Sequence, residues 1–229
     1  MCTLTFIPHL KSTTDFILTS NRDESPNRKT IFPKLYFEEG MEMCYPKDEL
    51  AGGTWIGASS RKRLVCLLNG GFEAHNRLKH YRKSRGLVVK ELLAATDTFS
   101  FLEKTELNKI EPFTIVSVDW NKKLELHQLV WDGNEKQIKQ ISVSPQIWSA
   151  SMLYSSETKK EREQLFLKFI NEEREFDRED IMGFQKKFVI DRELVKTTSI
   201  TQFVHSQKTS EMRYLDLQTG KTISTRMKF

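Results

Sequence analysis

The segment MCTLTFIPHLKSTTDFILTSNRDE, residues 1–24, decides the fold. Apolar and β-branched residues are concentrated in residues 2–7 and 15–19, and a polar stretch, residues 8–14, separates them. This arrangement predicts two short strands that pair as an antiparallel hairpin. A charged block, residues 21–24, begins where the second strand is expected to end. In a hairpin that end lies beside the start of the first strand, so the block should lie near the beginning of the chain.

Cys2 carries the most reactive side chain of this hairpin. Loss of Met1 would leave Cys2 with a thiol of pKa roughly 8.5 and an α-amine of pKa about 7.7–8.0, so that one residue would supply nucleophile and base. Arg22 could lower the thiol pKa, and Asp23 could orient the amine. A simpler interpretation also fits: Cys2 is a small apolar strand residue, and the charged block is a solvated loop or a surface ion pair.

The composition is typical of a globular protein. The chain has 229 residues, of which 38% are hydrophobic and 29% are charged, and no stretch rich in proline, glycine or serine divides it. We therefore expect one domain that spans residues 1–229. The 36 lysines and arginines exceed the 31 aspartates and glutamates, which gives a net charge of +5. This excess could attract a small anionic ligand, but it is too mild to indicate a nucleic-acid-binding protein.

Cysteine content and hydropathy favour a cytoplasmic protein. Cys2, Cys44 and Cys66 match neither a disulfide framework nor a zinc site, which indicates a reducing compartment. No apolar run approaches the length of a membrane span, and the first residues lack the basic start and long apolar stretch of a signal peptide. His75 and His80 have no third ligand at a suitable spacing. We expect no membrane span, no metal site and no cofactor.

The rest of the chain alternates groups of strands with groups of helices. Residues 25–50 contain three prolines and are expected to be loosely structured. We expect strands at residues 52–57, 64–69, 113–118, 124–131, 138–143, 198–205 and 212–217, and helices at 87–95, 99–107, 157–170 and 178–188. Ser84 and Asp97 should cap the first two helices, and Leu165, Phe166, Phe169 and Ile170 should form one buried face of the third. This order predicts an α+β layered fold with antiparallel sheets.

Several motifs together resemble the NRDE family, which includes transport and Golgi organisation proteins. The motifs are Met1-Cys2, Asn21-Arg22-Asp23-Glu24, Gly52-Gly53-Thr54-Trp55-Ile56-Gly57, Leu68-Asn69 and Ser84-Arg85-Gly86. Their order and spacing agree with the family over about the first 90 residues. The resemblance implies the αββα fold of N-terminal nucleophile hydrolases and a distant likeness to bile-salt and penicillin V acylases. It thereby implies a cysteine amidohydrolase that cleaves a C–N amide bond in a small, non-peptide substrate.

The resemblance assigns Cys2 as nucleophile, Arg22 and Asp23 as its neighbours, Asn69 as the oxyanion donor, and Asn21, Arg85 and Lys196 as substrate-binding residues. Asn69 also fits on chemical grounds, because a carboxamide that ends an apolar strand before two glycines can donate to a developing oxyanion. A hairpin turn is the competing interpretation of the same Asn-Gly pair. The basic stretch at residues 75–85 would favour an anionic substrate if it borders the site.

Two positions depart from the family pattern. The segment Ser149-Ala150-Ser151 stands where an asparagine is expected, so an amide contact is absent or replaced by a hydroxyl. Lys196 stands where arginine is expected, and lysine lacks the planar guanidinium group that binds a carboxylate through two parallel hydrogen bonds. These departures support a second hypothesis, a non-catalytic protein that binds or traffics a lipid, an acyl thioester or a haem-like ligand. Such a function would agree with the haem or lipid handling linked to the eukaryotic branch of the family.

Overall fold

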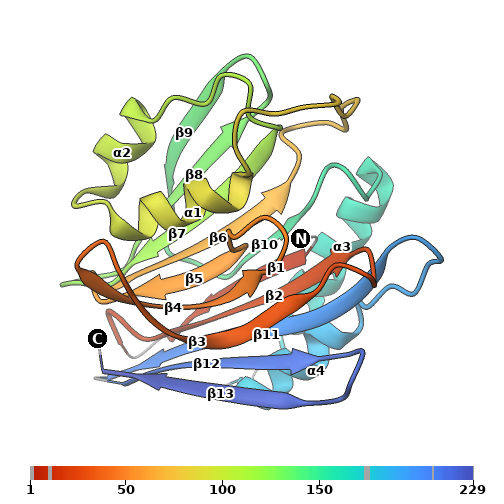
Figure 1. Cartoon of the computed structure of the whole chain (residues 1–229). Coiled ribbons are helices and arrows are strands. Elements are labelled where there is room, and N and C mark those ends of the chain that lie inside the picture. Colours follow the sequence, from red (N-terminus) through yellow and green to blue (C-terminus); the bar gives the residue numbers. More distant parts are fainter. Residues whose placement is uncertain (1–2, 10–11, 173–175, 208, 229) are drawn as a thin grey trace.

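The structure, a computed structural model, describes residues 3–9, 12–172, 176–207 and 209–228. Its strands are β1 (Thr3–Pro8), β2 (Phe16–Glu24), β3 (Thr30–Glu38), β4 (Met41–Asp48), β5 (Ile56–Ser59), β6 (Arg63–Asn69), β7 (Phe113–Asp119), β8 (Glu125–Trp131), β9 (Lys136–Ile141), β10 (Gln146–Ser149), β11 (Lys196–Ser206), β12 (Thr209–Asp216) and β13 (Thr222–Met227). Its helices are α1 (Arg85–Ala94), α2 (Thr98–Lys104), α3 (Ser156–Ile170) and α4 (Arg178–Lys186). Figure 1 shows their arrangement along the chain.

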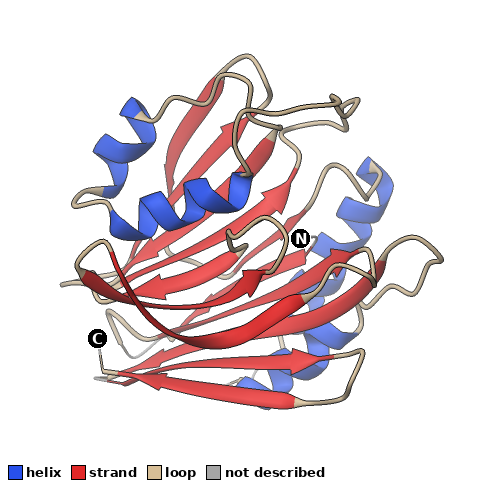
Figure 2. Ribbon diagram, in the orientation of Figure 1, coloured by secondary structure: helices blue, strands red, loops and turns tan. Residues whose placement is uncertain are grey.

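Two antiparallel sheets face each other between two layers of helices (Figure 2). The six-stranded sheet has the order β10-β1-β2-β11-β12-β13, and the seven-stranded sheet has the order β3-β4-β5-β6-β7-β8-β9. Helices α1 and α2 pack on the outer face of the seven-stranded sheet, and α3 and α4 pack on the outer face of the six-stranded sheet. The predicted α+β class and the αββα layering are therefore confirmed.

The alternation of side chains along β6 shows how one strand serves two cores. Leu64, Cys66 and Leu68 point into the core between the two sheets, whereas Val65 and Leu67 point outward toward α1 and α2. Successive side chains of a strand face opposite sides of a sheet, so a strand covered on both faces must be apolar throughout. The predicted strand at residues 64–69 is accordingly central and buried.

The hairpin of β1 and β2 lies at the centre of the six-stranded sheet. Leu4 pairs with Ser20 and Pro8 with Phe16, and β11 pairs with the other edge of β2. Inward-facing residues of the hairpin meet the opposite sheet in the inner core: Leu4, Phe6, Phe16 and Leu18. The hairpin predicted from the first 24 residues is confirmed, and its two strands lie next to each other inside the six-stranded sheet.

Two parts of the chain differ from the expectation. Residues 25–50 form β3 and β4 rather than a loose stretch, because β3 is an edge strand whose register shifts between Ile31 and Lys34 and so accommodates Pro33. The short strands β10 and β13 were also not expected; both are edges of the six-stranded sheet. In α3, Phe166 and Phe169 are buried as predicted, but Leu165 is 47% exposed.

Arg63 of β6 holds the C-terminal end of α1. Its Nη1 donates to the carbonyl oxygens of Leu92 at 2.9 Å and Ala95 at 2.6 Å. Its Nε donates to Asp119 at 2.8 Å. The last carbonyl oxygens of a helix have no N–H partner within the helix, so the Arg63 guanidinium supplies hydrogen-bond donors that the next turn would have provided. The other end of α1 is capped by Ser84, as predicted, whose Oγ accepts from the backbone N–H of Gly86. Asp97 caps α2 in the same way.

Gly53 and Gly86 bring the loop before β5 into direct backbone contact with the start of α1. A Cβ atom on Gly53 would lie 2.5 Å from the carbonyl carbon of Gly86. The backbone N–H of Thr54 also donates to the Gly86 oxygen at 3.2 Å. The loop and the helix can therefore touch because neither residue carries a side chain.

Gly53→Ala is expected to lower the free energy of unfolding by about 1–3 kcal/mol, because the added methyl group must push backbone atoms apart. Gly183→Ala is the matched control. Gly183 lies inside α4 with no atom within 4 Å of its Cβ position, so alanine should raise stability by about 0.5–1 kcal/mol. Urea denaturation of the three proteins measures both effects, and equal shifts for the two variants would contradict the proposed contact.

Across the described ranges, no helix combines the length and the apolar character needed to cross a membrane.

Candidate functional site

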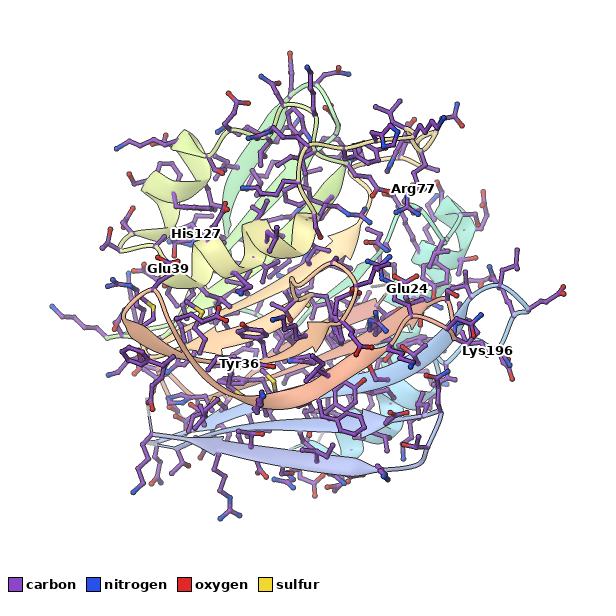
Figure 3. The ribbon with its side chains drawn as sticks, in the orientation of Figure 1. Glu24, Tyr36, Glu39, Arg77, His127 and Lys196 are labelled. Atoms are coloured by element: carbon purple, nitrogen blue, oxygen red, sulfur yellow. The ribbon has the colours of Figure 1, made fainter. Side chains whose placement is uncertain are left out.

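A cavity opens where the ends of β2 and β6 meet the N-terminus of α1 and the loop of residues 70–84. We call it the site cavity. It has two adjoining parts, with volumes of about 350 Å³ and about 70 Å³, which share these lining residues: Glu24, Arg28, Ala51, Asn69, Ser84 and Arg85. Asp23 and Glu111 also line the larger part, and Arg22 and Trp55 line the smaller part. Figure 3 shows Glu24 on the same side of the molecule as Arg77 and Lys196.

The charged block forms the last four residues of β2, and not a loop after the strand as expected. Strand β11 pairs with β2 as far as Glu24, which extends the strand beyond its apolar part. The side chains alternate, so Arg22 lies between the two sheets and its guanidinium carbon is 4.3 Å from the ring centroid of Trp55. Thr198, at an irregularity in β11, donates to the Arg22 carbonyl oxygen at 3.1 Å.

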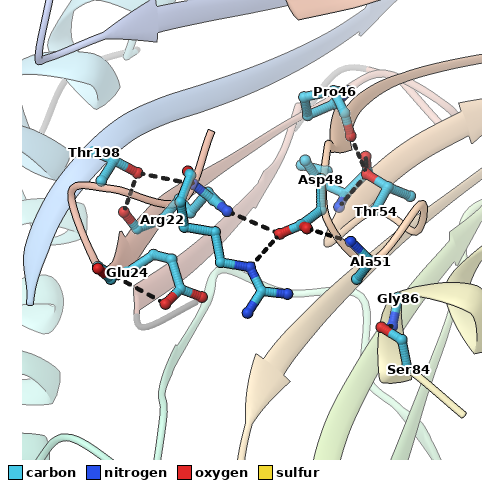
Figure 4. A network of polar contacts seen from close by, with 12 residues as sticks. Arg22, Glu24, Pro46, Asp48, Ala51, Thr54, Ser84, Gly86 and Thr198 are labelled. Atoms are coloured by element: carbon cyan, nitrogen blue, oxygen red, sulfur yellow. Dashed lines mark hydrogen bonds and ion pairs between the residues drawn. The ribbon is translucent and has the colours of Figure 1, made fainter. Parts of the chain in front are cut away.

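Asp48, at the end of β4, joins two arginines at the floor of the cavity (Figure 4). Its Oδ2 lies 3.1 Å from Nη2 of Arg22 and 2.8 Å from Nε of Arg28, and its Oδ1 accepts from the Ala51 N–H at 2.8 Å. Burial by itself would raise the pKa of Asp48, but the hydrogen bonds from Arg28 and Ala51 and the two positive charges hold it below its usual value. Asp48 is therefore ionised at neutral pH.

Asp23 is fixed by two hydroxyl groups. Its Oδ2 accepts from the Tyr154 hydroxyl at 2.6 Å, and its Oδ1 accepts from the Thr197 hydroxyl at 2.5 Å. The guanidinium carbon of Arg162 lies 3.6 Å from the centroid of the Tyr154 ring. Asp23 is 2% exposed. The carboxylate is thus held in one orientation at the edge of the cavity.

Arg85 enters the cavity at the first turn of α1. Glu111 lies 3.1 Å from Nη2 of Arg85, and it also lies 3.2 Å from Nε of Arg77 and 3.7 Å from Nε2 of His75. Burial lowers the pKa of Arg85, and the charge of Glu111 opposes that effect. Burial lowers the pKa of His75, so the charged partners of Glu111 are Arg77 and Arg85, and this wall of the cavity keeps an excess of positive charge.

Asn69, the last residue of β6, lines both parts of the site cavity. Its backbone pairs with Phe113, and the position of the side chain is set by the central strand rather than by a hairpin turn. Within the described part of the chain, the carboxamide of Asn69 makes no hydrogen bond. Its two N–H groups are consequently available to a ligand in the cavity.

Two predicted site residues lie apart from the cavity. Asn21 is fully buried under α4, where its Nδ2 donates to the Gln185 carbonyl oxygen at 3.5 Å. Lys196 pairs in register with Glu24, but its Nζ forms an ion pair with Asp191 at 2.7 Å. The site cavity is lined by neither residue. Contact of Asn21 and Lys196 with a substrate stays a prediction.

The segment that departs from the family pattern does not line the site cavity, but it leads directly into Met152 and Leu153, which line the larger part. Ser149 pairs with Thr3, and the side chain of Ala150 is buried in the inner core. Ser151 donates its hydroxyl hydrogen to the carbonyl oxygen of Gly71 at 2.8 Å. This hydroxyl therefore does not take the place of an amide donor in the cavity.

Cys2 lies outside the described residues, and its role as nucleophile stays a prediction. Thr3, the next residue, begins β1 and is buried. The structure brings together Arg22, Asp23, Asn69 and Arg85 around one cavity, although they come from three separate segments.

Three charged lining residues, Arg28, Asp48 and Glu111, were not found from the sequence. Asp48 and Glu111 are acidic residues flanking ordinary turns, and nothing near them in the sequence indicates their arginine partners. Arg28 lies four residues after the charged block and could have been included with it. In the ranges that the structure describes, no three His, Cys, Asp or Glu side chains are arranged to hold a metal ion.

Three solved structures with the same fold are named as a hydrolase, an acylase and an acid amidase. An arginine-to-leucine variant of conjugated bile acid hydrolase from Clostridium perfringens has a TM-score of 0.65 and 8% identity, with 99% of this chain and 92% of that chain covered. Penicillin V acylase from Agrobacterium tumefaciens has a TM-score of 0.64 and 8% identity, covering 99% and 86%. The Caenorhabditis elegans ortholog of N-acylethanolamine-hydrolyzing acid amidase has a TM-score of 0.62 and 14% identity, covering 89% and 92%. These likenesses show the fold of N-terminal nucleophile hydrolases.

Sequence comparison identifies the family that the motifs indicated. The mouse (Mus musculus) protein named Transport and Golgi organization 2 homolog is 31% identical over 120 residues. That match covers 49% of this chain and 41% of the mouse protein's length. The family model described as Transport and Golgi organisation 2 matches residues 1–225, and the chain therefore belongs to this family.

Proposed function

We propose that this protein is a cysteine amidohydrolase of the N-terminal nucleophile type, which cleaves a C–N amide bond in a small anionic molecule. The observation that carries the proposal is the meeting of Asn69 with Arg22 and Asp23 around one cavity at the end of β2. Strand β2 pairs with β1, whose first residue, Thr3, directly follows Cys2. The names of the solved structures with this fold, a bile acid hydrolase, a penicillin acylase and an acid amidase, support the reaction class.

The proposed reaction begins with Cys2. Its thiolate attacks the amide carbonyl carbon, a C–S bond forms, and the carbonyl oxygen gains negative charge that the Asn69 amide stabilises. The C–N bond then breaks, and the leaving amine takes the proton that the α-amine of Cys2 received from the thiol. Water attacks the thioester and releases the carboxylic acid, which regenerates Cys2. Arg85 and Arg28 line the larger part of the cavity and would attract an anionic group of the substrate.

Mass spectrometry tests the proposal directly. Incubation with a set of N-acyl amides that carry a carboxylate, sulfonate or phosphate should give an acyl adduct on Cys2 and release the free acid. Cys2→Ala should give neither product. Intact mass should show that Met1 is absent from the active protein, because a retained Met1 would block the α-amine. An active protein that keeps Met1, or product formation by Cys2→Ala, would contradict the mechanism.

A binding or trafficking function is the second candidate, and one observation favours it. Ala150 places a buried methyl group where an amide donor is expected, and the Ser151 hydroxyl is already engaged by Gly71. A cavity with a weakened oxyanion site could hold a lipid, an acyl thioester or a haem-like ligand without turnover. Titration followed by the fluorescence of Trp55, which lines the cavity, would detect such a ligand. Saturable binding of an intact ligand by wild type and Cys2→Ala alike would favour this function.

Selective alkylation should distinguish Cys2 from the other two cysteines. Cys44 and Cys66 are fully buried, and burial raises the pKa of each thiol to about 12. Iodoacetamide at neutral pH should therefore label the native protein at Cys2 and the denatured protein at all three positions. Peptide mass spectrometry after timed labelling measures the three rates.

The same labelling experiment tests the role of Arg22. If its charge lowers the thiol pKa of Cys2, Arg22→Ala should slow labelling at pH 7 by roughly tenfold or more. Arg61→Ala is the control, because Arg61 donates to the Ala94 carbonyl oxygen at the opposite end of α1 from the cavity. Equal labelling rates in wild type and Arg22→Ala would contradict an activating role for the arginine.

A further inference from the structure

Three of the four most exposed large apolar side chains among the described residues lie around the mouth of the site cavity. Among the described residues, four such side chains are more than 60% exposed: Leu50 at 83%, Leu194 at 78%, Phe37 at 76% and Leu78 at 64%. Phe37 belongs to the edge strand β3. The other three lie on separate loops. We call Leu50, Leu78 and Leu194 the rim leucines.

Each rim leucine is next in sequence to a residue that lines the larger part of the site cavity. The pairs are Leu50 with Ala51, Leu78 with Arg77, and Leu194 with Val195. The three loops connect β4 to β5, β6 to α1, and α4 to β11. The cavity mouth is therefore surrounded by three loops that each present a leucine to solvent.

This arrangement indicates an interaction surface. Single exposed apolar residues are normal on proteins, but several around one opening mark a place where a partner covers them. The rim leucines stand on separate loops and do not form a continuous groove, so they do not fit a peptide strand or a helix. A lipid surface suits them, because each leucine can insert separately into the boundary between headgroups and acyl chains.

The charges beside Leu78 favour an anionic surface, whereas Leu50 and Leu194 each follow an exposed glutamate, Glu49 and Glu193. The loop of residues 70–84 carries Arg77, Lys79, Arg82 and Lys83 against one acidic residue, Glu73. Leu78 stands directly between Arg77 and Lys79. Glu111 and Glu91 pair with Arg77 and Lys83 respectively. Lys79 is exposed and, in the described ranges, has no ion pair, so its charge remains available to lipid phosphate or carboxylate groups.

We propose that Leu50, Leu78 and Leu194 dock the mouth of the site cavity onto an anionic lipid membrane surface. The inference rests on exposure, position and charge, and it does not depend on the proposed hydrolase activity. In the docked state the cavity opens toward the lipid headgroups, and the leucines contribute apolar burial while Lys79 contributes attraction.

Vesicle flotation tests the proposal with the full chain. The protein should float with vesicles of phosphatidylcholine mixed with phosphatidylserine, should float less with phosphatidylcholine alone, and should dissociate as salt is raised. The triple variant Leu50→Ser, Leu78→Ser, Leu194→Ser should lose roughly tenfold or more of its partition onto the mixed vesicles. Phe37→Ser is the matched control, since Phe37 is as exposed as the rim leucines but belongs to β3. It should bind like the wild type.

A second measurement does not require the triple variant to fold. In a Cys2→Ser background, an environment-sensitive dye on Leu78→Cys or Leu194→Cys should shift to the blue when the mixed vesicles are added. The same dye on Phe37→Cys should not shift. Wild-type protein that stays unbound, a triple variant that binds normally, or equal dye shifts at positions 37, 78 and 194 would each overturn the proposal.

Discussion

Asp48→Ala is expected to lower the free energy of unfolding by about 3–5 kcal/mol, because it removes one partner of a buried ion pair. The Arg22 side chain is 3% exposed, and Asp48 is the carboxylate that contacts its guanidinium. Without Asp48, the buried positive charge of Arg22 loses the carboxylate that contacts it directly. Arg28 would also lose its 2.8 Å partner, but Arg28 can turn toward solvent because its side chain is 27% exposed.

Urea denaturation measures this loss, and Asp132→Ala provides a matched control. Asp132 accepts hydrogen bonds from the backbone N–H groups of Asn134 and Glu135, much as Asp48 accepts one from Ala51, but it has no buried arginine partner. Its replacement reports the cost of losing the turn contacts alone. A loss for Asp48→Ala no larger than that for Asp132→Ala would show that the ion pair contributes little.

The Asp48 contribution should depend on pH in a defined direction. Because the folded pKa of Asp48 lies below its ordinary value, the carboxylate stabilises the fold fully at pH values above the unfolded pKa, about 3.9. The contribution is lost as pH falls from there through the lower folded pKa. The difference in unfolding free energy between wild type and Asp48→Ala should therefore be constant near neutrality and should shrink below about pH 4.

Asn69→Ala is expected to lower kcat by about 10²–10³, equivalent to about 2.7–4 kcal/mol of transition-state stabilisation, on any amide that the protein is shown to cleave. The reason is the unused carboxamide in the cavity, whose N–H groups are free to receive the oxyanion. Substrate binding in the ground state should change less, so KM should move little compared with kcat.

Asn76→Ala is the control for this prediction. Asn76 is exposed in the loop of residues 70–84, so its replacement should leave both kcat and KM unchanged. Asn69→Ala should also unfold at the same urea concentration as the wild type, because the removed amide makes no hydrogen bond within the described residues. An unchanged kcat in a stably folded Asn69→Ala protein would reject the oxyanion role.

The sequence allowed the layers and the central hairpin to be predicted because apolar periodicity reports which faces of an element are buried. The run that became β6 is apolar on both faces, and those that became β7 and β8 place apolar residues on both faces, as central strands covered by a second layer do. The edge strands β3, β10 and β13 were missed because edge strands tolerate proline and polar residues. Strand β4, which is not an edge, was missed with its neighbour β3 because Pro46 and charged residues interrupt its apolar pattern. Their formation depends on neighbours that are distant in the sequence.

The candidate site could be predicted only in part, for the same reason. Arg22, Asp23 and Asn69 were found because motifs place them at strand ends. The partner of Arg22 is Asp48, which lies on another sheet, and the partner of Asp23 is Tyr154, which lies 131 residues away. The burial of Asn21 under α4 also depends on a helix at the far end of the chain. No local pattern contains such contacts.

The fastening of α1 at both ends has a consequence for how the cavity can open. Arg63 fixes the last turn of α1, and the contact between Gly53 and Gly86 fixes its first turn. The helix therefore cannot slide or rotate without breaking backbone contacts, and the wall that it forms is preorganised before any ligand arrives. A motion that widens the entrance must therefore come from the loops around the mouth, which include residues 71–83, while the helix behind them stays still.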